Sequence, residues 1–226
     1  MVKPQIIGEG IFDIFYLITV ITAGVSMFLN SKDDFLCKLF SYSVLVLGLG
    51  DTTHLVPRLL SMVSGGFEKY KRSIGFGKLM TSITITFYYI IMFYFVCIKY
   101  NDLNQQLTYT FLAISALRII ICLLPQNEWF TTGGTMTMNF LRNVPFVIIG
   151  LIVIYKFYIF RNIDEDFKYV YLAIIISFGF YLPVIFFAHK YPIVGMLMIP
   201  KTVAYLYIVY VGYKHYIGFN SQQSEL

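Results

Sequence analysis

Long apolar runs, separated by short polar or charged breaks, make up almost the whole chain. Each run is continuous instead of alternating with period 2, which predicts helices and not the strands of a barrel. A bilayer core of about 30 Å requires about 20 apolar residues per helix, and seven runs reach that length. They cover residues 8–29, 36–60, 76–99, 105–124, 139–160, 167–188 and 193–216. The pattern predicts an all-α fold, in which residues 1–226 form one domain of seven transmembrane helices with short loops.

The composition supports this prediction and narrows the class of protein. Hydrophobic residues make up 58% of the 226 residues and charged residues 13%. A soluble domain carries about 25% charged residues, so this chain has too few charges for a surface that faces water on all sides. A nucleic-acid-binding domain is excluded for the same reason. We therefore expect an integral, multi-pass membrane protein whose main partner is the lipid bilayer.

An odd number of spans places the two termini on opposite sides of the membrane, here called the N-terminal side and the C-terminal side. The most basic break between spans lies on the N-terminal side, where Lys69, Lys71, Arg72 and Lys78 accompany Glu68. Lysine and arginine are enriched in cytoplasmic loops. The sequence therefore favours a cytoplasmic N-terminus and a C-terminus on the opposite side.

Ionisable residues inside the predicted spans give the first indication of function. Such residues are expensive in lipid and usually mark a binding site or a pathway. At 1.5 Å per residue, the deep ones all fall in the half of the membrane near the N-terminal side. They are Asp13, Asp51, His54, Arg118, Arg142 and Lys201. This distribution predicts a polar pocket that opens to the N-terminal side above a floor of apolar and aromatic residues. The alternative is a closed network in which Asp13 and Asp51 pair with the three cations and tie the helices together.

The second span carries the densest polar motif. Asp51, His54 and Arg58 are spaced i, i+3 and i+7, so they share one helix face. In this arrangement Asp51 can orient His54, and Arg58 can bind an anion at the pocket mouth. Elsewhere, Arg142 and Asn143 offer a guanidinium and an amide on the fifth span.

These residues predict a binding or transport protein for a small anionic or zwitterionic molecule, or for a lipid headgroup. Arg58, Arg118, Arg142 and Lys201 would neutralise the negative charge of the ligand. Asp13, Asn143 and Thr84 are further candidate ligand contacts. Trp129, the only tryptophan, is expected to anchor the chain at the membrane interface, and the alternative is a lid over the pocket.

Two alternatives remain open at this stage. The first is an intramembrane hydrolase or transferase acting on lipids, in which His54 is a general base held by Asp51. The second is a membrane assembly partner in which the charges only lock helices together.

The sequence also carries three short resemblances to known membrane-protein families. Seven helices with a histidine on the second, His54, resemble alkaline ceramidase and adiponectin-receptor hydrolases. That resemblance implies a bound zinc ion. The paired histidines on the last helix of those hydrolases are missing here, so His54, His189 and Asp51 would have to supply the zinc ligands.

The string Gly48-Leu49-Gly50-Asp51 is similar to the GxGD signature of presenilin-type and prepilin-peptidase proteases. These proteases need a second aspartate at the same depth, and the only candidate in this sequence is Asp13, which lies closer to the membrane surface. Lys201 lies in the seventh span, like the Schiff-base lysine of microbial rhodopsins, but the third span offers no carboxylate counterion. Since each resemblance covers one short motif at most, the sequence alone identifies no family.

Overall fold

The structure is a computed structural model that describes residues 4–64, 66–131, 135–188 and 190–218. Within these residues every long element is a helix, and seven helices are long and apolar enough to cross a membrane. Six of them are α1 (Pro4–Asn30), α2 (Phe35–Ser64), α3 (Phe67–Lys99), α4 (Gln105–Leu123), α5 (Met136–Ile159) and α6 (Val170–Phe187), and the seventh span, Ile193–Ile217, consists of α7 (Met198–Tyr213) with the short helical segments on either side of it. The predicted all-α fold with seven transmembrane helices is thereby confirmed, and the chain is an integral, multi-pass membrane protein.

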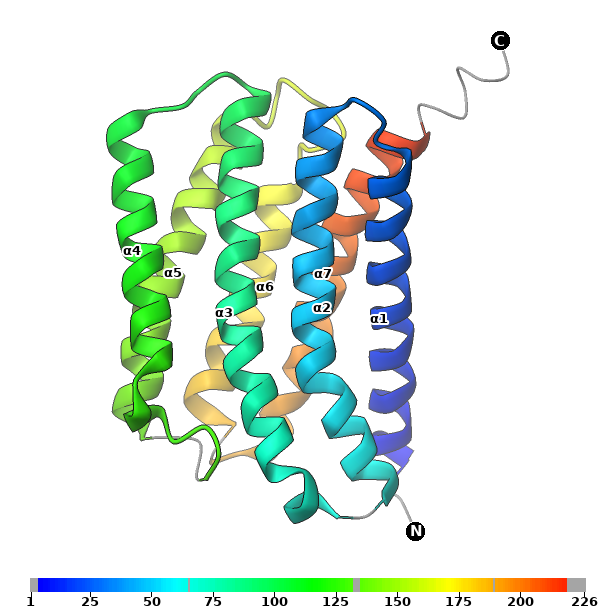
Figure 1. Cartoon of the computed structure of the whole chain (residues 1–226), viewed down its shortest axis with the longest axis vertical. Coiled ribbons are helices and arrows are strands. Elements are labelled where there is room, and N and C mark those ends of the chain that lie inside the picture. Colours follow the sequence, from blue (N-terminus) through cyan, green and yellow to red (C-terminus); the bar gives the residue numbers. More distant parts are fainter. Residues whose placement is uncertain (1–3, 65, 132–134, 189, 219–226) are drawn as a thin grey trace.

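The helices stand side by side as a single bundle (Figure 1). α4 and α5 form one flank, α1 lies at the opposite flank beside α2 and α7, and α3 and α6 lie between them (Figure 1). α1 begins and α7 ends at opposite ends of the bundle (Figure 1). The N-terminal side therefore carries the connections from α2 to α3, from α4 to α5 and from α6 to α7.

Several helix ends differ from the predicted spans. α3 begins at Phe67 instead of residue 76, so the basic stretch expected in a loop forms the first turns of this helix. α7 begins at Met198, after the short 3₁₀ helix η2 (Pro192–Leu197), and continues into a π-helical turn, η3 (Lys214–Gly218). The length of an apolar run predicts the lipid-embedded part of a helix. Lysine and arginine are good helix formers, so a helix can continue through them beyond that part.

α2 and α3 approach each other closely through glycines. A Cβ at Gly77 would overlap the Thr53 carbonyl, and one at Gly50 would overlap the Thr84 side chain. Small residues allow such close helix packing in membranes, where contact between backbones replaces the hydrophobic effect as a driving force. Pro57 interrupts α2 one turn after Thr53, whose carbonyl loses its usual helical donor. The glycine contacts thus fix the part of α2 that carries the predicted polar motif.

An aromatic layer crosses the middle of the bundle. Tyr88 and Tyr89 of α3 make edge-to-face contacts with Tyr205 of α7 and Phe146 of α5. Phe178 of α6 packs against Tyr89 and Phe146 with ring centroids 5.8 and 4.9 Å apart. All five side chains are buried. Because such rings pack in specific geometries, this layer holds five residues from four helices in a fixed relation.

Candidate functional site

A cavity of about 380 Å³ lies in the half of the bundle near the N-terminal side. Residues from all seven helices line it, and Phe146 and Tyr205 of the aromatic layer are among them. Most of the residues predicted to form a site also line this cavity: Asp13, Asp51, His54, Arg58, Arg118, Arg142, Asn143 and Lys201. A volume of this size is within the range of small-molecule sites.

Two predicted site residues stand apart from this group. Thr84 is not among the residues that line the cavity. Its hydroxyl donates to the Met80 carbonyl at 3.0 Å, and its side chain packs on Gly50 of α2. Thr84 thus serves the contact between α2 and α3. His189 lies outside the described residues, so the zinc site predicted from His54, His189 and Asp51 stays a prediction.

Carboxylates line the wall formed by α1 and α2. Glu9 pairs with Arg58 at 2.9 Å, while the Tyr16 hydroxyl donates to Oδ2 of Asp51 at 2.6 Å. Asp13 lies between Glu9 and Tyr16 on the same face of α1 and is only 9% exposed. Its Oδ2 atom is buried, and no residue in the described part of the chain forms a hydrogen bond with it. A buried carboxylate oxygen without a donor is costly, so this wall offers an unused acceptor.

Arg118 of α4 is the most deeply buried cation of the opposite wall, with 2% of its surface exposed. Its guanidinium donates to the Ser82 carbonyl at 2.9 Å, to the Arg142 carbonyl at 3.4 Å and to the Thr86 hydroxyl. It also lies 3.9 Å from the centre of the Phe146 ring. All of these partners are neutral. The hydrogen bonds therefore fix the position of the guanidinium without cancelling its charge.

Arg142 of α5 is held in a similar way. It donates to the side-chain oxygens of Asn127, at 3.0 Å, and of Asn139. Its guanidinium carbon lies 4.3 Å from the centre of the Trp129 ring, a cation–π contact. Beside it, Asn143 accepts a hydrogen bond from the Tyr181 hydroxyl at 3.0 Å. This wall presents two fixed guanidinium groups in a setting of amides and aromatic rings.

Lys201 of α7 lies between the two walls. Its ammonium is 4.5 Å from the centre of the Tyr181 ring and 5.7 Å from that of Tyr205. Within the described residues, no carboxylate lies in ion-pair range of Lys201, Arg118 or Arg142. Asp13 and Asp51 therefore form no direct ion pair with these three cations, although the charges of Asp51 and Lys201 are close enough to interact.

Asp51 and His54 line the same cavity but are not joined. Asp51 is engaged by Tyr16, and the His54 ring bonds to the backbone of Ile74 on α3. Nδ1 of His54 is buried and has no hydrogen-bond partner among the described residues. Asp51 therefore does not orient His54 in the way that a general base held by a carboxylate requires.

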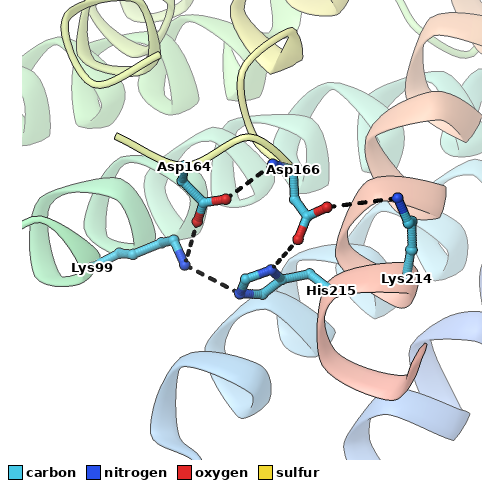
Figure 2. A network of polar contacts seen from close by, with 5 residues as sticks. All are labelled: Lys99, Asp164, Asp166, Lys214 and His215. Carbon is cyan, nitrogen blue, oxygen red and sulfur yellow. Dashed lines mark hydrogen bonds and ion pairs between the residues drawn. The ribbon is translucent and has the colours of Figure 1, made fainter. Parts of the chain in front are cut away.

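A second polar cluster lies at the other end of the bundle. Asp166 accepts from Nδ1 of His215 at 2.7 Å, and Asp164 pairs with Lys99 at 2.9 Å (Figure 2). Lys214 lies 3.8 Å from Asp166, and Lys99 also contacts Nε2 of His215 (Figure 2). Burial alone would raise the pKa of Asp164, but the hydrogen bond and charge of Lys99, together with smaller contributions from His215 and the Asp166 backbone, lower that pKa below its usual value.

The cluster joins α3, the α5–α6 connection and the end of α7. Asp164, Asp166 and His215 lie close enough together to hold a metal ion. However, Lys99 and Lys214 already place positive charge against both carboxylates. A metal ion would have to displace these lysines, so the arrangement is better explained as a link between helix ends.

No model of a known protein family matches this chain, and comparisons with curated proteins and with solved structures also found no match.

Sequence reasoning missed several residues of the cavity wall. Trp129, expected at the membrane interface, is 9% exposed and donates its indole N–H to the Cys122 carbonyl at 2.8 Å. Tyr16 and Tyr181 supply hydroxyls to Asp51 and Asn143. The spacing of Glu9, Asp13 and Tyr16 at i, i+4 and i+7 was a signal for a polar face on α1. No comparable pattern marks Tyr181 or Trp129.

Proposed function

We propose that this protein binds or transports a small anionic or zwitterionic molecule, or a lipid headgroup, in the cavity near its N-terminal side. The observation that carries the proposal is the state of the three central cations. Arg118 and Arg142 are positioned by neutral groups, and Lys201 lies against aromatic rings, with no ion pair to a described carboxylate. Their charges remain available to a ligand.

The energetics of a membrane interior favour this interpretation. An uncompensated charge inside a protein costs several kcal/mol, and it is retained where it serves a pathway or a site. A ligand anion would regain that energy, because the attraction between charges is stronger away from bulk water. Arg118 and Arg142 are already fixed by hydrogen bonds, so little side-chain freedom is lost when an anion binds.

The hydrolase or transferase alternative requires His54 to be activated by Asp51. The bonds of Asp51 to Tyr16 and of His54 to the Ile74 backbone favour binding over catalysis. Zinc analysis of the purified protein separates the two: stoichiometric zinc that is lost in His54→Ala would favour the enzyme. The assembly-partner alternative predicts that substitutions of the cavity cations impair folding and have no separate effect on binding.

The proposal is tested with inorganic phosphate as the probe. The protein is purified in an uncharged maltoside detergent, and its thermal unfolding midpoint is measured as phosphate is titrated at constant ionic strength. A ligand that binds the folded state raises this midpoint with concentration. We expect a rise in the wild type that is reduced in Arg142→Gln and in Lys201→Gln.

Arg161→Gln is the matched control, because Arg161 stacks on Tyr158 beyond the opposite end of α5 and does not line the cavity. It should respond to phosphate as the wild type does. An equal response in all four proteins would refute the proposal, and so would a wild type that responds neither to phosphate nor to phospholipid headgroups in nanodiscs. With the basic stretch of α3 at the same end of the bundle, we also propose that the cavity faces the cytoplasm.

A further inference from the structure

The buried carboxylates and the guanidinium groups of α4 and α5 lie on different helices around the cavity. Asp13 and Asp51 belong to α1 and α2, whereas Arg118 and Arg142 belong to α4 and α5. In the bundle α1 and α4 lie at opposite flanks (Figure 1). Glu9 and Arg58, which also line the cavity, pair with each other at 2.9 Å and so largely cancel. The cavity therefore has an acidic wall on α1 and α2 and a basic wall on α4 and α5, with Lys78 of α3 and Lys201 of α7 as further cations in its lining.

Each wall carries groups whose hydrogen bonds or charges the protein itself does not fully satisfy. On the acidic wall, Oδ2 of the buried Asp13 has no hydrogen-bond donor in the described part of the chain, and a single hydroxyl, that of Tyr16, donates to Asp51. On the basic wall, the two guanidinium groups have neutral partners. A simple anion would satisfy the basic wall and would be repelled by the carboxylates opposite.

We infer that the ligand is a zwitterion, whose phosphate or carboxylate binds Arg118 and Arg142 and whose ammonium group binds Asp13 and Asp51. This inference rests on the proposed function and specifies the chemistry of its ligand. An ammonium group brings three donors to a wall that lacks them, and the anion accepts from guanidinium groups already in place. A cavity of about 380 Å³ has room for a small molecule that carries both charges.

Two probes that differ by one ammonium group test the inference. Phosphoethanolamine carries phosphate and ammonium, whereas ethyl phosphate carries the phosphate alone. Their dissociation constants are measured by calorimetric titration of the intact protein in maltoside detergent. We expect phosphoethanolamine to bind about tenfold more tightly, the effect of one charge-assisted hydrogen bond.

The decisive result is a change of opposite sign in Asp13→Asn. This substitution should weaken phosphoethanolamine binding about tenfold, because the ammonium loses its partner. It should strengthen ethyl phosphate binding, because a repulsive charge is removed. Asp51→Asn should act in the same way and replaces Asp13→Asn if that variant does not fold. Asp102→Asn is the control, since Asp102 pairs with Lys156 outside the cavity and should change neither constant.

The outcomes separate this inference from the proposed function. Equal affinity for both probes, or a shift of the same sign for both in the aspartate variants, overturns the zwitterion and leaves anion binding standing. Failure of both soluble probes overturns both proposals, unless the zwitterion is a lipid headgroup. In that case nanodiscs with phosphatidylethanolamine in place of phosphatidylglycerol should stabilise the wild type but not Asp13→Asn, and the inference stands.

Discussion

Replacing Arg118 with methionine distinguishes a binding cation from a structural one. Breaking a buried ion pair costs about 3–5 kcal/mol, because the partner charge is left uncompensated. Arg118 is 2% exposed, but its acceptors are neutral, and the Ser82 carbonyl keeps the Thr86 hydroxyl as a donor at 2.9 Å. An acceptor left unsatisfied costs about 1–3 kcal/mol, while removal of the buried guanidinium recovers part of its desolvation penalty. We therefore expect the free energy of unfolding to stay within about 2 kcal/mol of the wild type.

Phosphate affinity should respond much more strongly. A hydrogen bond to a charged group contributes about 1.5–3 kcal/mol, so Arg118→Met should weaken phosphate binding by about 10- to 100-fold. The assay combines denaturant unfolding in maltoside micelles, followed by circular dichroism, with phosphate titration of the folded variant.

The matched control is Lys156→Met, another buried cation. Its ammonium lies 2.6 Å from Oδ2 of Asp102, and the lysine side chain is 3% exposed. Because 38% of the Asp102 side chain is exposed, we expect a loss of about 1–3 kcal/mol, less than for a fully buried pair. Phosphate affinity should not change. The reasoning is refuted if Arg118→Met loses 3–5 kcal/mol, as for a broken ion pair, while the folded fraction binds phosphate normally.

Two further predictions concern the scaffold. Gly77→Val should lower the free energy of unfolding by about 1–3 kcal/mol, because a Cβ there meets the α2 backbone. Gly179→Ala, with nothing within 4 Å of the added Cβ, should be neutral or slightly stabilising in the same denaturant assay, and an equal loss in both would contradict this explanation. The pKa of Asp164 is lowered by Lys99, so its stabilisation is complete above the ordinary carboxyl pKa of about 3.9 and is lost as the pH falls through the lower folded-state value. Asp164→Asn should therefore reduce the fall in unfolding midpoint between pH 7 and pH 3, whereas Glu165→Gln, a change at a side chain 95% exposed, should not.

The fold was predictable because the bilayer constrains sequence strongly. Each span must hide its backbone polar groups in a helix and present about 20 apolar residues, and both requirements are visible in a single sequence. The ends of helices are not under the same constraint. α3 begins at Phe67 and includes the charged Glu68 and Lys69, where the length of the apolar run carries no information.

The depth of the site residues in the membrane was predictable from the sequence, but the contacts between their side chains were not. Counting residues along each span placed Asp51, Arg118 and Lys201 at similar heights, and the structure brings all three to one cavity. Which groups touch is decided by the rotation of each helix and by contacts between helices. The hydrogen bond from Tyr16 to Asp51 joins residues 35 positions apart, and the Arg118 acceptors are backbone carbonyls that any residue type supplies.

The two ends of the bundle show that a shortage of acids does not explain the unpaired cations. Near the C-terminal side, Lys99, Lys156 and Lys214 lie 2.9, 2.6 and 3.8 Å from carboxylates. In the cavity, Asp13 and Asp51 would be enough to pair with two of the cations of α4, α5 and α7, yet no described ion pair joins them. Where charges serve only to hold helices, this chain pairs them. In the cavity the chain keeps the carboxylates and the guanidinium groups on facing walls and bears the cost of their desolvation. A ligand that binds both walls is the best explanation of this separation.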